Sequence, residues 1–177
     1  MYTEEQKKQI AEENRKLCER FPFLTPWNRF SGKLITECMD GEKGYWPGSP
    51  EEIPEYDWSY TELDDMPDGW RKAFGMQMCE EIREALVEDG DLNRWRIEQL
   101  KEKYGSMRLY DNGTKVGSRI PAIIDKYERM SEKICVSCGK PATRITKGWI
   151  CPYCDDCCPD GGWAPIDEWF KEDEKIE

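Results

Sequence analysis

The sequence predicts an α+β fold: a mainly helical domain with a small β-hairpin and a cysteine-rich module near the C-terminal end. Three observations lead to this prediction. Apolar residues recur at helical spacing in several segments, a short alternating stretch ends in a turn signal, and six of the nine cysteines fall within residues 135–158. The 177 residues suffice for one compact domain with a small annex.

We therefore divide the chain into two predicted domains. Residues 1–134 form the helical α+β domain, which includes an acidic, aromatic-rich loop region over residues 22–69. Residues 135–177 form the cysteine module and a short tail. The loop region is assigned from its many prolines and glycines, which disfavour long regular elements.

The composition is that of a folded protein of a reducing compartment. Apolar residues make up 38% of the chain and charged residues 36%, and no apolar run approaches the roughly 18 residues of a membrane span. The polar N-terminus does not resemble a signal peptide. We therefore expect a cytoplasmic protein with no membrane partner, in which clustered cysteines indicate metal binding rather than disulfides.

A net charge of −11 argues against direct nucleic-acid binding, because phosphate recognition depends on clusters of lysine and arginine. It is compatible with a basic protein partner. The need for solubility would explain the charge equally well.

The first helix is expected from Glu4 to about Arg20, because Thr3 and Gln6 form a capping-box pattern and Pro22 ends the segment. The second lies within residues 68–90. Its apolar residues recur every four positions, and Gly90 follows its end: Trp70, Phe74, Met78, Ile82 and Leu86.

Residues 95–105 suit either a helix closed by Gly105 or a strand, and we favour the helix. Residues 106–117 resemble a hairpin that turns at Asp111–Gly113. Pro121 opens a last long helix that reaches about Lys133. The tail has the pattern of a short amphipathic helix, with Pro165, Ile166, Trp169 and Phe170.

The cysteine module offers three CxxC pairs: Cys135 with Cys138, Cys151 with Cys154, and Cys154 with Cys157. Gly139 follows the first pair and allows a tight turn that points backbone N–H groups at the thiolates. Pro152 follows Cys151 and removes one such N–H. The spacing between pairs also favours Cys154 with Cys157.

We therefore predict Cys135, Cys138, Cys154 and Cys157 as the ligands of one structural Zn²⁺. Cys151 and Cys158 are spare, and either could substitute for a lost neighbour. Four thiolates saturate a tetrahedral zinc and leave no position for substrate. The alternative, a redox CxxC, requires a thioredoxin-like βαβ pattern that this sequence does not have.

The sequence does not predict an enzyme. It contains no histidine, which excludes histidine-based acid–base catalysis and Ser-His-Asp triads, and it lacks the phosphate-binding and nucleophile-elbow motifs. Cys79-Glu80-Glu81 imitates half of a zinc-deaminase motif, but Tyr153 stands where that motif needs proline. A hydrolase with paired carboxylates is a further, weaker hypothesis.

An acidic, aromatic stretch is the candidate binding surface. No lysine or arginine occurs from Gly44 to Trp70, where eight carboxylates alternate with aromatic residues. Spaced carboxylates can imitate phosphates toward a basic cleft, and aromatic residues anchor interfaces. The alternative is a solvated acidic loop whose aromatics pack back on the domain. With one tryptophan of the tail, the predicted partner-binding residues are Glu51, Glu52, Glu55, Tyr56, Asp57, Trp58, Asp64, Asp65 and Trp169.

Three segments in this order resemble a family of small phage and prophage zinc-module proteins of Firmicutes: YTELDDMPDGWRKAFGMQMCEEI, IEQLKEKYGSMRLYDNG, and the run from SEKICVSCGKPA to GWICPYCDDC. The resemblance covers about residues 55–158. It implies the same four cysteine ligands, with the position of Cys151 not a ligand, and the cytoplasm of a bacterial host. Some small, acidic, metal-containing phage proteins of this kind are anti-CRISPR proteins, which disable the RNA-guided nuclease of type II systems.

The resemblance thus implies a non-enzymatic, phage-encoded inhibitor that binds a host defence nuclease, or blocks its loading with nucleic acid. That nuclease has a strongly basic nucleic-acid channel, which an acidic protein could occupy. The alternative is a phage structural or regulatory adaptor that uses the zinc module to hold a docking surface.

Overall fold

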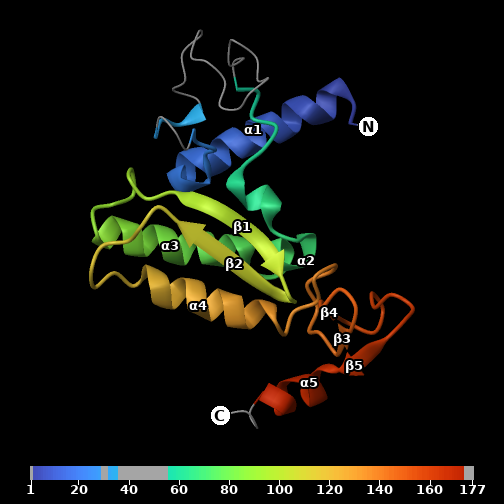
Figure 1. Cartoon of the computed structure of the whole chain (residues 1–177). Helices are drawn as coiled ribbons and strands as arrows, with labels where there is room; N and C mark the ends of the chain where they lie inside the picture. Colours follow the sequence, from blue (N-terminus) through green and yellow to red (C-terminus); the bar gives the residue numbers. More distant parts are fainter. Residues whose placement is uncertain (1, 29–31, 36–55, 174–177) are drawn as a thin grey trace, which may run out of the picture. The chain divides into compact units, whose positions relative to one another are not determined.

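The computed structural model describes residues 2–28, 32–35 and 56–173. In the described residues, helices combine with two small antiparallel sheets (Figure 1), and a group of cysteines lies in the C-terminal region, which confirms the predicted α+β class. By the density of its internal contacts the chain divides into two compact units, residues 1–64 and 65–177.

The first unit begins with helix α1 (Glu4–Arg20). The predicted capping box is confirmed: the backbone N–H of Gln6 donates to Thr3 Oγ1 at 3.2 Å, and the Gln6 side-chain oxygen accepts from the backbone N–H of Thr3 at 2.9 Å. The helix ends before a proline, as predicted, because proline cannot donate the next helical hydrogen bond. A short 3₁₀ turn, η1 (Pro22–Leu24), follows it.

Residues 56–64, the described part of the acidic stretch in this unit, are held by hydrogen bonds. The side-chain amide of Asn14 in α1 donates to the carbonyl oxygen of Trp58 at 2.8 Å. Asp64 accepts from the backbone N–H and the hydroxyl of Thr61, at 2.6 and 3.0 Å. The first contact ties the stretch to α1 and the others close a local turn, while Asp57 and Asp64 stay exposed and Glu62 is buried.

The second unit begins with a helical stretch built from α2 (Asp68–Trp70), a π-helical turn η4 (Arg71–Gly75) and α3 (Met76–Glu88). The predicted helix is confirmed, and its five apolar residues at i+4 spacing are all buried. In an α-helix each step of four residues overshoots a full turn by about 40°. A π turn is wider, with i→i+5 hydrogen bonds, and reduces this drift so that all five side chains reach one core.

The helix favoured for residues 95–105 is wrong, because this segment is the first strand of a hairpin. Strand β1 (Ile97–Lys103) pairs antiparallel with β2 (Ser106–Asp111). A register shift between Ile97 and Gln99 marks a bulge. The bulge places Ile97 and Leu100 on the same buried face although they lie three residues apart. That spacing is what made the segment resemble a helix.

The predicted turn at Asp111–Gly113 is also wrong, because β2 ends at Asp111 and its partner strand precedes it in the chain. The hairpin turns at Tyr104 and Gly105, which have φ angles of +55° and +81°. A two-residue turn with both central residues in the left-handed region matches the twist of the strands. Asparagine usually occupies the first of these positions, so the tyrosine there hides the turn from sequence inspection.

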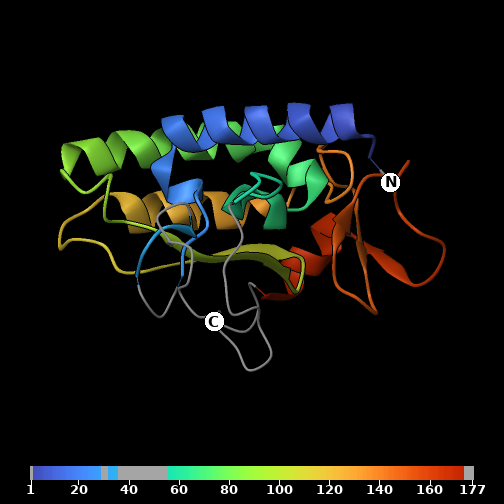
Figure 2. The same ribbon diagram turned by 90° about the horizontal axis from the view of Figure 1, so that it is seen from above.

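Helix α4 (Ile120–Ser131) begins with a proline in its first turn, as predicted. It contacts both α3 and β2: α4 runs alongside β2 (Figure 1), and α3 lies behind the hairpin, as the view from above also shows (Figure 2). Side chains of α4 also cover the outer edge of β2. Ser131 Oγ accepts from the backbone N–H of Met107 at 2.8 Å, and Glu128 Oε1 accepts from that of Leu109 at 3.2 Å. These bonds leave that edge less open to pairing with another chain.

The C-terminal part of this unit contains a three-stranded antiparallel sheet. Strand β3 (Arg144–Thr146) lies between β4 (Pro152–Tyr153) and β5 (Trp163–Pro165). The predicted tail helix is confirmed as α5 (Ile166–Asp173). Among the described residues, every helix is too short or too polar to serve as a bilayer span.

We expect Tyr104→Asn to raise the free energy of unfolding by about 1 kcal/mol, because a left-handed backbone costs most side chains about 1–2 kcal/mol and asparagine tolerates it best. Denaturant unfolding measures the change. Gly105→Ala is the opposing control and should destabilise, since its φ is also left-handed and a Cβ would lie 3.3 Å from Ile150. If Tyr104→Asn leaves the stability unchanged or lowers it, the left-handed backbone at Tyr104 is not strained.

Candidate functional site: a group of four cysteines

The candidate site lies where two loops of the second unit meet. One loop follows α4 and contains Cys135 and Cys138, and the backbone N–H of Gly139 closes it by donating to the carbonyl oxygen of Cys135 at 3.0 Å. Gly139 has a φ of +81°, which explains the glycine at this turn. In the other loop, the N–H of Cys157 donates to the carbonyl oxygen of Cys154 at 3.2 Å.

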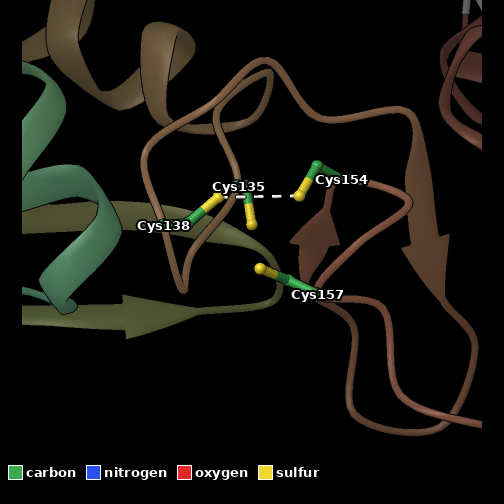
Figure 3. A group of neighbouring side chains, drawn as sticks. All are labelled: Cys135, Cys138, Cys154 and Cys157. Carbon is green, nitrogen blue, oxygen red and sulfur yellow. Dashed lines mark hydrogen bonds between the residues drawn. The ribbon is translucent and has the colours of Figure 1, made fainter.

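The four sulfur atoms converge on one point (Figure 3). All of them lie within 4.8 Å of one another, and Sγ of Cys138 and Sγ of Cys154 are 3.5 Å apart. A tetrahedral zinc with Zn–S bonds of about 2.3 Å requires sulfur–sulfur separations of about 3.8 Å. Cys135 and Cys154 are buried, whereas Cys138 and Cys157 are partly exposed. The arrangement could hold a metal ion, and its members are the four cysteines selected from the sequence.

The environment of the four thiols differs from one to the next. Burial by itself raises the pKa of Cys135, but backbone N–H groups of Cys154, Cys138 and Ser137 oppose it and the pKa falls to about 7. Hydrogen bonds with the thiols of Cys138 and Cys154 raise the pKa of Cys157 to about 12. Thiols this close cannot all ionise against one another, whereas a divalent cation at their centre favours four thiolates.

The two spare cysteines do not join this group. Cys151 is buried, and burial together with the neighbouring carboxylate of Glu102 raises the pKa of its thiol to about 12. A thiol kept protonated in this way acts as a small apolar residue. The Cys158 thiol donates weakly to the carbonyl oxygen of Pro159, with sulfur and oxygen 3.7 Å apart.

The first cysteine loop is seated on the start of the helical stretch 68–88. The indole N–H of Trp70 donates to the carbonyl oxygen of Ile134 at 2.9 Å, and the backbone N–H of Gly69 donates to that of Val136 at 3.0 Å. A Cβ on Gly69 would lie 2.2 Å from the carbonyl oxygen of Cys135. Glycine is therefore required where helix and loop backbones meet, a role that sequence reasoning missed.

The second loop is joined to the first by β-type hydrogen bonds. The backbone N–H of Val136 donates to the carbonyl oxygen of Pro152 at 2.9 Å. The backbone N–H of Thr143 donates to the carbonyl oxygen of Tyr153, also at 2.9 Å. Both cysteine loops are thus connected through β3 and β4 as well as through the sulfur atoms. A metal ion here would tie together segments that have little apolar core of their own.

A tight turn over residues 146–151 carries Trp149. The backbone N–H of Thr146 donates to the carbonyl oxygen of Cys151 at 3.1 Å, and the N–H of Cys151 donates to Thr146 Oγ1 at 3.0 Å. Trp149 is 77% exposed, and its indole N–H donates to Glu102 Oε2 at 3.1 Å. This exposed and oriented tryptophan was not singled out from the sequence.

The turn faces the tip of the hairpin across a cleft of about 320 Å³. Its lining combines both segments: Glu102, Lys103, Tyr104, Gly148, Trp149 and Ile150. Nothing in the sequence indicates this juxtaposition, because Gly148 lies 44 positions after Tyr104 and the hairpin itself was misassigned.

The predicted partner-binding residues are only partly described. Glu51, Glu52 and Glu55 lie outside the described residues. In the first unit, Asp57 is exposed and caps a local turn by accepting from the backbone N–H of Ser59 at 3.0 Å.

Tyr56 and Trp58 are half-buried, with ring centroids 5.4 Å apart. Asp64 and Asp65 are exposed at the end of η3 (Glu62–Asp65), and Trp169 is half-buried in α5. Both interpretations of the stretch stay predictions, since its aromatic residues are partly packed, Glu62 is buried, and Asp57, Asp64 and Asp65 are exposed.

The imitation of a deaminase motif is not assembled. Cys79 is fully buried inside α3. Glu81 accepts hydrogen bonds from Lys126 at 2.7 Å and from the hydroxyl of Tyr127 at 2.8 Å. Neither residue belongs to the metal-binding group found among the described residues.

Comparison of the chain with models of protein families, with curated proteins and with solved structures finds no match. The family resemblance inferred from the motifs therefore stays a prediction.

Gly69→Ala should lower the free energy of unfolding by about 2–3 kcal/mol, because its Cβ must displace the backbone of the cysteine loop. Gly148→Ala is the matched control, since a Cβ there meets nothing within 4 Å, and it should change stability by less than about 0.5 kcal/mol. Denaturant unfolding of both variants makes the comparison. Equal effects of the two substitutions would contradict the close packing of loop on helix.

Proposed function

We propose that this protein is a non-enzymatic binding protein whose shape is held by one structural Zn²⁺. The observation that carries the proposal is the convergence of four cysteine sulfurs within 4.8 Å. Tetrahedral sites of four thiolates suit zinc or iron–sulfur centres, and zinc sites of this kind are coordinatively closed. Its function then depends on the surface that the metal holds in place.

For the partner, we propose a basic host protein, and specifically the RNA-guided nuclease of a type II defence system. Three features support this choice: a net charge of −11, the acidic stretch without a basic residue from Gly44 to Trp70, and the resemblance to phage zinc-module proteins. Carboxylates spaced along a protein segment can compete with phosphates for a basic channel. Inhibition would follow from occupation of that channel, without bond-making chemistry.

We expect the purified protein to contain one zinc ion per chain, measured by native mass spectrometry and elemental analysis. Cys138→Ser should release the metal and unfold the module, because binding energies of such sites are of order 10 kcal/mol. Cys158→Ser is the matched control and should retain full zinc content. Iron with visible absorption, or a folded metal-free protein, would contradict the proposal.

Zinc retention should also fall as the pH is lowered. The metal requires thiolates, so binding releases protons, and protonation of the cysteines competes with the metal below neutral pH. Titration with a chelator at pH 5 and pH 8 should remove zinc more readily at the lower pH. Equal removal at both values would exclude thiolate ligands.

Binding to the purified type II nuclease at physiological salt tests the partner. We expect replacement of four carboxylates, Glu51→Lys, Glu52→Lys, Asp64→Asn and Asp65→Lys, to weaken binding about tenfold or more. Asparagine at position 64 keeps an acceptor for Thr61.

The control set makes the same change in net charge elsewhere: Glu13→Lys, Glu19→Lys, Glu84→Lys and Glu168→Gln. If both sets weaken nuclease binding equally, the attraction depends on net charge alone and not on the acidic stretch. Absence of any complex with the wild-type protein would exclude this partner.

A further inference from the structure

We propose that the cleft between the hairpin tip and the Trp149 turn binds an arginine side chain of the protein partner, with its guanidinium stacked on the indole ring of Trp149 and its charge met by Glu102. The inference rests on the proposed function for one point only, the basic character of the partner. The cleft itself is defined by residues of the second unit.

Two large aromatic rings border the cleft and are open to solvent. Trp149 is 77% exposed and Tyr104 is 74% exposed. Ring faces of this kind attract cations through their quadrupole, and tryptophan does so most strongly. Arginine also stacks on such rings through its planar guanidinium, which is more weakly hydrated than an ammonium group.

The same module already contains one such contact. The guanidinium carbon of Arg144 lies 4.0 Å from the centroid of the Trp163 ring. Likewise, Lys103 Nζ lies 5.5 Å from the centroid of the Tyr104 ring. The ring of Trp163 is therefore occupied from within the chain, whereas Trp149 borders the 320 Å³ cleft and also a second hollow of about 240 Å³.

The indole of Trp149 and the backbone of Tyr104 are both held in place within the chain. The indole N–H of Trp149 is held by Glu102, and the turn that carries it is closed by hydrogen bonds of Thr146. Tyr104 is kept in a left-handed conformation with φ +55°. A strained backbone at this exposed aromatic residue, where asparagine would fit better, supports a role of the tyrosine ring in binding.

The lining contains one carboxylate, Glu102, and one ammonium group, Lys103, so a cationic ligand would be attracted by Glu102 and by the negative charge of the whole protein. Glu102 accepts from the backbone N–H of Gly105 at 2.8 Å and from the Trp149 indole, and its carboxylate also contacts the Cys151 thiol. A carboxylate offers about four acceptor positions, so one more donor can be accommodated. An anionic ligand would be repelled by this carboxylate and by the overall charge of −11. Within the lining only Lys103 would attract it.

The test is an NMR titration of the zinc-loaded, full-length protein with a capped Gly-Arg-Arg-Gly peptide. The indole N–H signal of Trp149 is identified by its loss in Trp149→Phe. We expect this signal and the backbone N–H signals of Gly148 and Ile150 to shift and to saturate. The same peptide with citrulline in place of arginine should bind at least about tenfold more weakly, because it has lost its charge.

Variants separate recognition from folding. Trp149→Ala should abolish the shifts at Gly148 and Ile150, whereas Trp163→Ala, an exposed tryptophan of the same module, should leave them unchanged. Tyr104→Asn should weaken peptide binding severalfold although it stabilises the fold. A purely structural role of Tyr104 predicts that binding is retained in this variant.

Three results would overturn the proposal: equal binding of the arginine and citrulline peptides, shifts produced by oligothymidine but not by the peptide, or no shift up to about 10 mM peptide. The second of these would identify a nucleobase as the occupant. The result is independent of the nuclease experiment. If the peptide binds but the nuclease does not, the proposed function is wrong and the arginine-binding cleft stands. If the nuclease binds but the peptide does not, the arginine-binding cleft is wrong and the proposed function stands.

Discussion

The C-terminal part of the second unit is organised around the meeting of four thiols from two loops. These loops contain short strands and many turns, and they bury few apolar side chains of their own. Their order relies on three kinds of contact: the sulfur cluster, the β-type hydrogen bonds that join Val136 to Pro152, and the seat of the first loop on Gly69 and Trp70. A cation at the sulfur cluster would make these contacts mutually dependent.

This arrangement links the cysteine group to the exposed surface. The second loop leads from β3 through the Trp149 turn to Cys151 and Cys154, so a metal ion that fixes the cysteines also limits where the indole can lie. The hairpin supplies the opposite wall of the cleft, and Glu102 holds the indole from that side. A metal ion at the four cysteines would therefore also stiffen one wall of the proposed arginine-binding cleft.

Much of the fold was accessible from local patterns. The capping residues Thr3 and Gln6 and the periodic apolar residues of the helix around Met78 act within one helical turn, and tertiary contacts did not override them. The hairpin was missed because two local signals were misleading. A bulge gave Ile97 and Leu100 a helical spacing. In addition, a tyrosine occupies the turn position at which asparagine is usually found and by which such a turn is recognised in a sequence.

For the site, the sequence by itself determined which four cysteines come together, because ligand spacing and the tight turn at Gly139 are local properties of the chain. It also determined the charge and the α+β class. The tertiary structure alone decided that Gly69 must lack a side chain, that Cys151 is buried beside Glu102, and that Tyr104 and Trp149 share a cleft. These features depend on segments far apart in sequence, whose approach is set by packing of the hairpin, the helices and the cysteine loops rather than by any local pattern.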